Sequence, residues 1–140
     1  MRRQITGLIL AGALTASAGL VLAPAASAKD GDARYRAACD MGSRSDVKLR
    51  DKDGRIRVDF YVKNNQIGEA WNYTLTQNGT TVVTSTRSTR ATDDSSDDDS
   101  RHTAEVKWKS YLTNAPGTDT IAARAVNAKT GEVCTFNGTR

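Results

Sequence analysis

The chain has 140 residues, with 20 lysines and arginines against 16 aspartates and glutamates, and a formal net charge of +4. Such a small positive excess gives no argument for a nucleic-acid function from bulk charge. The single histidine excludes a metal site with several histidine ligands, and the length suits one domain with one core rather than two.

The N-terminal residues predict an export signal. A basic start at Arg2 and Arg3 is followed by a run of apolar and small residues over 5–23 and a small-residue cleavage site at 26–28. The alanine-rich composition is typical of bacterial signals, and no other stretch is long enough to span a membrane. We therefore expect a signal peptide over 1–28 and a secreted, extracellular product without a membrane span.

The segment after the signal, residues 29–38, is polar and contains glycine and aspartate. We expect it to be a mobile leader in front of a single domain over 39–140. Two arginines leave with the signal, so the remaining chain is closer to neutral than the full sequence.

Alternating apolar residues predict the first two strands, over 47–49 and 56–62. Between them, residues 51–54 read Asp-Lys-Asp-Gly and have the length and the glycine of a hairpin loop. The two strands should therefore form a hairpin with one face exposed to water.

The second predicted hairpin joins strands over 71–76 and 81–89 through the tight-turn sequence Asn78-Gly79. The strand over 81–89 alternates poorly, so we expect it at a sheet edge. Three more strands are predicted over 104–109, 121–125 and 133–136.

Seven short strands separated by turn signals are typical of an all-β sandwich. Trp71 opens the third strand, where many immunoglobulin-like and fibronectin-like domains bury a tryptophan. The chain thus resembles that superfamily at the level of the fold, which implies a single seven-stranded antiparallel β-sandwich and assigns no active-site residue. A closed meander β-barrel is the alternative, because most connections look like hairpins. Trp71 and Trp108 share the phase of the apolar residues and are expected in the core.

Cys39 and Cys134 are the only cysteines. An exported chain reaches an oxidising compartment, where an even number of two allows one intramolecular bridge. A redox pair would need closer spacing or a partner histidine. We therefore predict a structural disulfide.

The segment 91–101 is rich in aspartate and serine. Clustered carboxylates attract calcium, but this run has neither the glycine nor the terminal glutamate of a helix-loop-helix calcium site. We expect a solvated loop and no cofactor, with five residues as weak calcium candidates: Asp93, Asp94, Asp97, Asp98 and Asp99.

Catalytic motifs are missing from the sequence. His102 is the only histidine available as a base, and no Gly-x-Ser-x-Gly turn presents a serine. Paired carboxylates for sugar hydrolysis are the remaining option, and the candidates are Asp59, Glu69, Glu105 and Asp119. We expect a protein that is not an enzyme.

A basic face is predicted on the exposed side of the sheet. In an immunoglobulin-like order the first, second and fifth predicted strands share a sheet. The side opposite their apolar residues carries Asp59 and Glu105 against six cations, here called the basic face: Lys48, Arg50, Arg55, Arg57, Lys107 and Lys109.

The basic face suggests a non-catalytic binding module whose partner is an acidic cell-envelope polymer, either a polysaccharide or a phosphate-bearing chain. Charges on exposed strand positions also occur simply for solubility and edge protection. A weak carboxylate hydrolase of envelope polysaccharide and a secreted inhibitor are the alternative functions.

Overall fold

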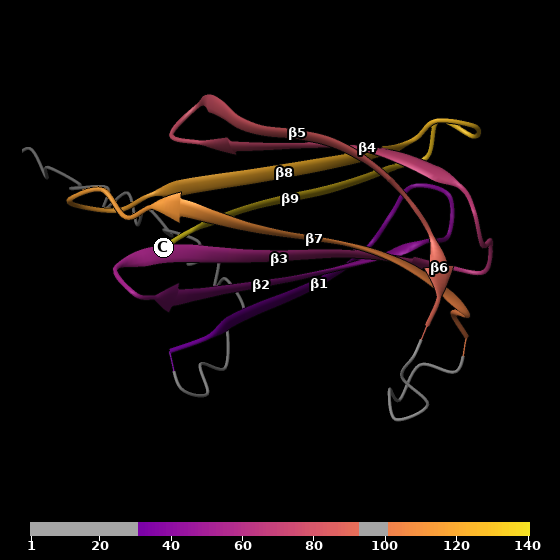
Figure 1. Cartoon of the computed structure of the whole chain (residues 1–140), viewed down its shortest axis with the longest axis horizontal. Helices are drawn as coiled ribbons and strands as arrows, with labels where there is room; N and C mark the ends of the chain where they lie inside the picture. Colours follow the sequence, from indigo (N-terminus) through magenta and orange to yellow (C-terminus); the bar gives the residue numbers. More distant parts are fainter. Residues whose placement is uncertain (1–30, 93–100) are drawn as a thin grey trace, which may run out of the picture.

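The structure of the protein is a computed structural model that describes residues 31–92 and 101–140. Within these ranges the chain folds into strands, and no helix there could cross a membrane. The strands are β1 (Ala33–Ala38), β2 (Arg44–Lys52), β3 (Arg55–Asn64), β4 (Ala70–Gln77), β5 (Thr80–Ser88), β6 (Arg90–Ala91), β7 (Ala104–Thr113), β8 (Thr120–Asn127) and β9 (Val133–Thr139) (Figure 1).

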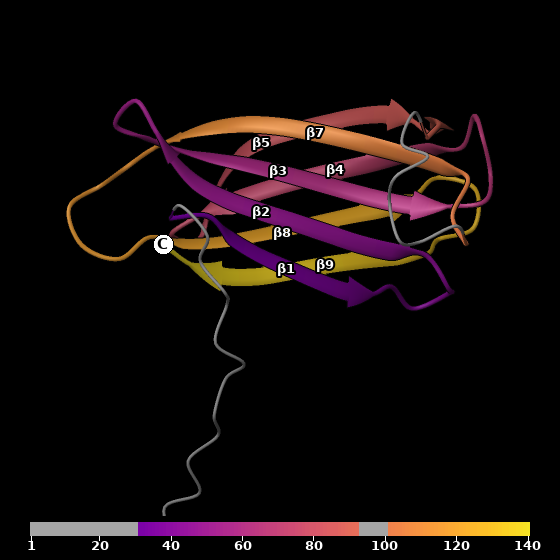
Figure 2. The same cartoon turned by 90° about the horizontal axis from the view of Figure 1, so that it is seen from below.

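The strands form two antiparallel sheets that lie face to face. One sheet has the order β1-β2-β3-β7-β6 and the other β5-β4-β8-β9. Figure 2 looks onto β7, β3, β2 and β1, with β5, β4, β8 and β9 behind them. The fold is therefore a β-sandwich, as predicted, and the alternative of a closed barrel is wrong because the strands divide into two separate sheets.

The strand number differs from the prediction, because the described residues contain nine strands rather than seven. Residues 29–38 were expected to be a leader, but Ala33–Ala38 form β1, which pairs with β2 along its whole length. The other addition is β6, which has two residues and pairs with Glu105 and Ala104 of β7.

Two predicted hairpin turns are confirmed. Asp53 and Gly54 join β2 to β3 with φ angles of 52° and 72°, and Asn78 and Gly79 join β4 to β5 with φ angles of 50° and 80°. Two successive residues with positive φ are typical of the tight turn whose twist matches antiparallel strands, and aspartate, asparagine and glycine tolerate that conformation best. β5 is an edge strand, also as predicted.

The core lies between the two sheets and is centred on aromatic rings. Trp71 and Trp108 are 0% and 2% exposed, which confirms their predicted burial. The Tyr73 ring stacks on Trp108 with 4.7 Å between centroids, and Phe60 packs beside both at 5.4 and 6.1 Å. Burial raises the pKa of the Tyr73 phenol, because desolvation disfavours its charged form.

The predicted disulfide joins Cys39 to Cys134. Cys39 directly follows β1 and Cys134 lies in β9, so the bridge connects one sheet to the other. Beside it, the rings of Tyr35 and Phe136 are 4.9 Å apart. The β1 and β9 edges of the sandwich are thereby held together.

Candidate binding face

The strand register places the six predicted basic residues on one outer face of the sandwich. In the pairing of β2 with β3, Arg50 lies opposite Arg57 and Lys52 opposite Arg55. In the pairing of β3 with β7, Lys109 lies opposite Asp59 and Lys107 opposite Tyr61. Since side chains alternate between the faces of a strand, residues opposite one another share a face. The three strands that carry the basic face are therefore neighbours.

Asp59 organises the centre of this face. Its carboxylate is fully buried and bonds to Arg50 Nη2 at 2.9 Å and to Arg57 Nη2 at 3.0 Å, with Arg57 Nε at 3.1 Å from the second oxygen. The hydrogen bonds that Arg57 donates to Asp59 raise the pKa of the Arg57 guanidinium. Two of the six predicted cations, Arg50 and Arg57, are therefore paired with the buried Asp59 and are not free of a counterion.

A similar pairing involves Lys48. Its Nζ lies 2.7 Å from Asp32 Oδ2, and the hydrogen bond from Lys48 lowers the pKa of that carboxyl. Arg55 lies over the Tyr111 ring, with its guanidinium carbon 4.9 Å from the ring centroid. Lys109 is exposed on β7.

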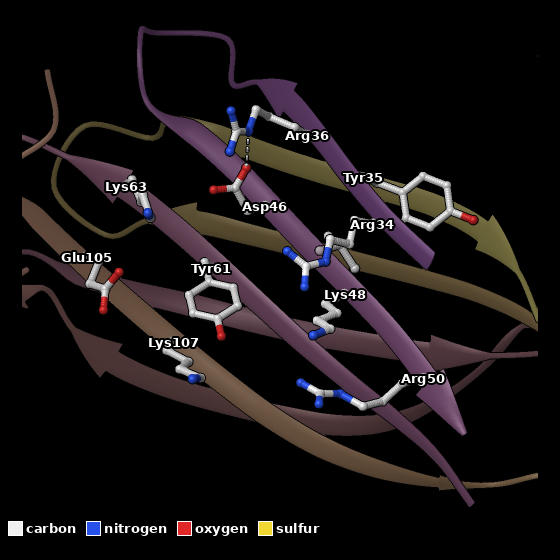
Figure 3. Close-up of a pocket in the computed structure, with 11 residues that line it drawn as sticks. Arg34, Tyr35, Arg36, Asp46, Lys48, Arg50, Tyr61, Lys63, Glu105 and Lys107 are labelled. Atoms are coloured by element: carbon white, nitrogen blue, oxygen red, sulfur yellow. Dashed lines mark hydrogen bonds and ion pairs between the residues drawn. The ribbon is translucent and has the colours of Figure 1, made fainter. Parts of the chain in front are cut away.

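A concavity of about 540 Å³ lies on this face, around Tyr61 (Figure 3). Lys107 Nζ lies over the Tyr61 ring, 4.7 Å from its centroid. The charged lining consists of the carboxylates Asp46 and Glu105 and six cations, which together are here called the basic concavity: Arg34, Arg36, Lys48, Arg50, Lys63 and Lys107.

The basic concavity overlaps only partly with the predicted basic face. Lys48, Arg50 and Lys107 belong to both sets, whereas Arg34 and Arg36 come from β1, which the sequence did not predict. Arg36 Nε bonds to Asp46 Oδ1 at 2.9 Å, across the β1–β2 pair. The signal that could have found β1 is the weak alternation of Ala33, Tyr35 and Ala37 with two arginines.

The carboxylates considered for hydrolysis do not form one cluster. Asp59 and Glu105 share the outer face, but Glu105 pairs with Lys63, four residues or about 13 Å along β3 from Asp59. Glu69 accepts a hydrogen bond from Asn127, at the end of β8, whereas Asp119 immediately precedes that strand. The two carboxyl groups of a glycosidase lie about 5 to 9.5 Å apart, so neither of these pairs fits.

The calcium candidates Asp93, Asp94, Asp97, Asp98 and Asp99 lie outside the described residues. Within residues 31–92 and 101–140, histidine, cysteine, aspartate and glutamate side chains form no group of three or more that could hold a metal ion.

Comparison of the chain with protein-family models gives no matching family, and comparison with curated proteins gives no matching relative. The site must therefore be interpreted from its own geometry and charge.

Proposed function

We propose that this protein is a secreted, non-catalytic binding module that docks on an acidic cell-envelope polymer through the basic concavity. The observation that carries the proposal is the charge around the Tyr61 ring, where the lining holds six cations and two carboxylates. Two of these cations, Lys48 and Arg50, also pair with Asp32 and Asp59 beside the lining, so the cations still outnumber the carboxylates by six to four. Several cations at fixed positions can contact successive anionic groups of a chain, so modest individual contacts add together along one polymer.

The chemistry of the lining suits phosphate or carboxylate groups. A guanidinium group such as that of Arg34 can donate parallel hydrogen bonds to a planar carboxylate or to a phosphate. The Arg36 guanidinium already donates to Asp46 through Nε. Lys107 remains beside the Tyr61 ring, which keeps its charge close to the centre of the concavity. Attraction between such exposed groups and a polyanion weakens as salt screens it.

We also propose that the sandwich is immunoglobulin-like. The order β2-β3-β7-β6 in one sheet and β5-β4-β8-β9 in the other supports this, because immunoglobulin domains place their first, second, fifth and fourth strands together and their third, sixth and seventh together. In this assignment β1 is an added N-terminal strand and β5 extends the second sheet. Loops and sheet surfaces of this fold carry many unrelated binding functions.

The test is charge reversal at two positions that hold no buried carboxylate. Arg34→Glu with Lys107→Glu should abolish retention on immobilised polyphosphate and on a cell-envelope fraction at low salt. Arg57 is unsuitable, because a glutamate there would face the buried Asp59. The matched control, Arg124→Glu with Lys129→Glu, makes the same change in net charge at exposed positions of β8 and the following turn.

Retention should survive in the control and be lost in the first variant, while both keep the far-ultraviolet circular dichroism and the thermal midpoint of the wild type. Raising the salt concentration should release the wild type. Equal retention of both variants, or equal loss in both, would remove the basic concavity as the binding site.

A further inference from the structure

β5 is a long edge strand with an exposed sequence. Eight of its nine residues pair with β4 on one side, Val82 forms a bulge, and no other described strand pairs with β5 on the other side. Most of its residues are exposed, including Val82 at 44%. Residues 80–86 are only threonine, valine and serine, without the charges or proline that protect many sheet edges from pairing. The protective features that β5 does have are the bulge at Val82 and Arg87 near its end, which leave residues 83–86 as a regular, uncharged edge.

The other edges of the sandwich are not open in this way. β6 has only two residues. β1 and β9 are joined to each other by the disulfide and by the Tyr35–Phe136 contact. Arg140 also bonds to Asp51 at 2.8 Å, which ties the residue after β9 to β2. Among the described strands, β5 therefore offers the longest unpaired backbone.

The sheet around β5 also lacks the charge that covers the opposite face. The register places Thr84 opposite Thr74 and Thr86 opposite Asn72, and Thr86 Oγ1 donates a hydrogen bond to Asn72 Oδ1 at 2.7 Å. Arg124, opposite Thr74 on the other side, is the charged residue of this outer row. Two copies of a basic protein repel each other least where their surfaces carry least charge, so this edge favours a second copy as its partner.

We propose that two copies of this protein pair antiparallel through β5, so that two four-stranded sheets become one continuous sheet. Antiparallel pairing of identical strands places a twofold axis perpendicular to the sheet. The two sheets that carry the basic concavities then lie on the same side of the dimer. If the proposed function holds, the dimer presents two equivalent concavities to one polymer and binds it bivalently.

Sedimentation of the oxidised protein without any polymer tests the pairing itself. The wild type should show a monomer–dimer equilibrium, and Val82→Lys with Thr84→Lys should weaken dimerisation at least tenfold, because lysines on an edge strand oppose pairing. The control, Thr135→Lys with Asn137→Lys, adds the same charge at exposed positions of β9 and should dimerise like the wild type. Amide hydrogen exchange should show that protection of β5 increases with protein concentration.

A wild type that stays monomeric at about 100 µM would overturn the pairing, since a dissociation constant above that concentration corresponds to a contact weaker than about 5.5 kcal/mol. So would equal weakening of dimerisation by both lysine variants, or a dimer that neither variant affects. Polymer binding is measured separately. A dimer that does not bind polyphosphate refutes the proposed function but not the β5 pairing. If the β5 pairing and the proposed function are both correct, Val82→Lys with Thr84→Lys should lower the affinity for long polyphosphate and leave the affinity for short phosphate oligomers unchanged.

Discussion

The two long sides of the sandwich differ in how the sheets are joined. On the side of β1 and β9, a disulfide, a pair of packed rings and buried hydrogen bonds link one sheet to the other. On the side of β5 and β6, the chain itself crosses between the sheets, and Arg87 Nη1 donates to the carbonyl of Lys107 at 3.0 Å. A small sandwich can therefore concentrate the contacts between its sheets along one side and leave the other side available for contacts with a partner.

Removing the disulfide should produce the largest loss of stability on the side of β1 and β9. Cys39 and Cys134 are 95 residues apart, and closing a loop of that size stabilises a fold by roughly 4–5 kcal/mol in the chain-entropy model. Cys39→Ser with Cys134→Ser should lower the free energy of unfolding in urea by up to that amount, and reduction of the wild type should have the same effect. A loss below about 1 kcal/mol in both experiments would mean that noncovalent contacts hold this side.

A smaller loss is expected at Glu132, which is 6% exposed beside the disulfide. Its two carboxylate oxygens accept hydrogen bonds from the Ser43 amide and hydroxyl, both at 2.7 Å. Glu132→Ala leaves these buried donors without acceptors and should cost about 1–3 kcal/mol in urea unfolding. Glu105→Ala, on the outer face, should change stability by less than about 0.5 kcal/mol; a similar cost at both positions would argue against the buried contact.

The smallest effect on stability is expected at acidic pH, where Asp119 becomes protonated. Hydrogen bonds from the side chains of Gln77 and Asn78, at 2.9 and 2.8 Å, lower the pKa of this carboxyl below its ordinary value of 3.8. Its contribution to stability is therefore present above that value and disappears as pH falls through the lower folded-state pKa. Unfolding measured at successive acidic pH values should lose stability more steeply in the wild type than in Asp119→Asn. The same slope in both proteins would refute this contribution.

Much of the fold was predictable because alternation reports which side of a strand is buried. The hairpins around Gly54 and Gly79, the edge position of β5 and the burial of both tryptophans follow from short-range patterns. β1 was missed because two of its inward-phase residues, Ala33 and Ala37, are small and the strand follows a polar segment. β6 was missed because two residues are too few to establish a period.

The candidate site was less predictable because its charges depend on neighbours far apart in the sequence. Alternation alone placed Arg50, Arg57 and Lys107 on one face, and the register agrees. It could not show that Asp59 is buried between two arginines, since that depends on which residues of β2 and β3 lie opposite each other. The alternation pattern also could not place Arg34 in the concavity, because Arg34 lies on β1, which was not predicted.

The bridge between Cys39 and Cys134 has a mechanical consequence. A force that pulls on the chain before Cys39 and after Cys134 passes through the sulfur–sulfur bond, so the 94 residues between them carry none of the tension. The whole of β1, which lies before Cys39, and the part of β9 after Cys134 can be extended under load. If the protein is anchored at one end and loaded at the other, strands β2 to β8 should keep their arrangement until the covalent bond itself is reduced, whereas Arg34 and Arg36 of the basic concavity move away with β1.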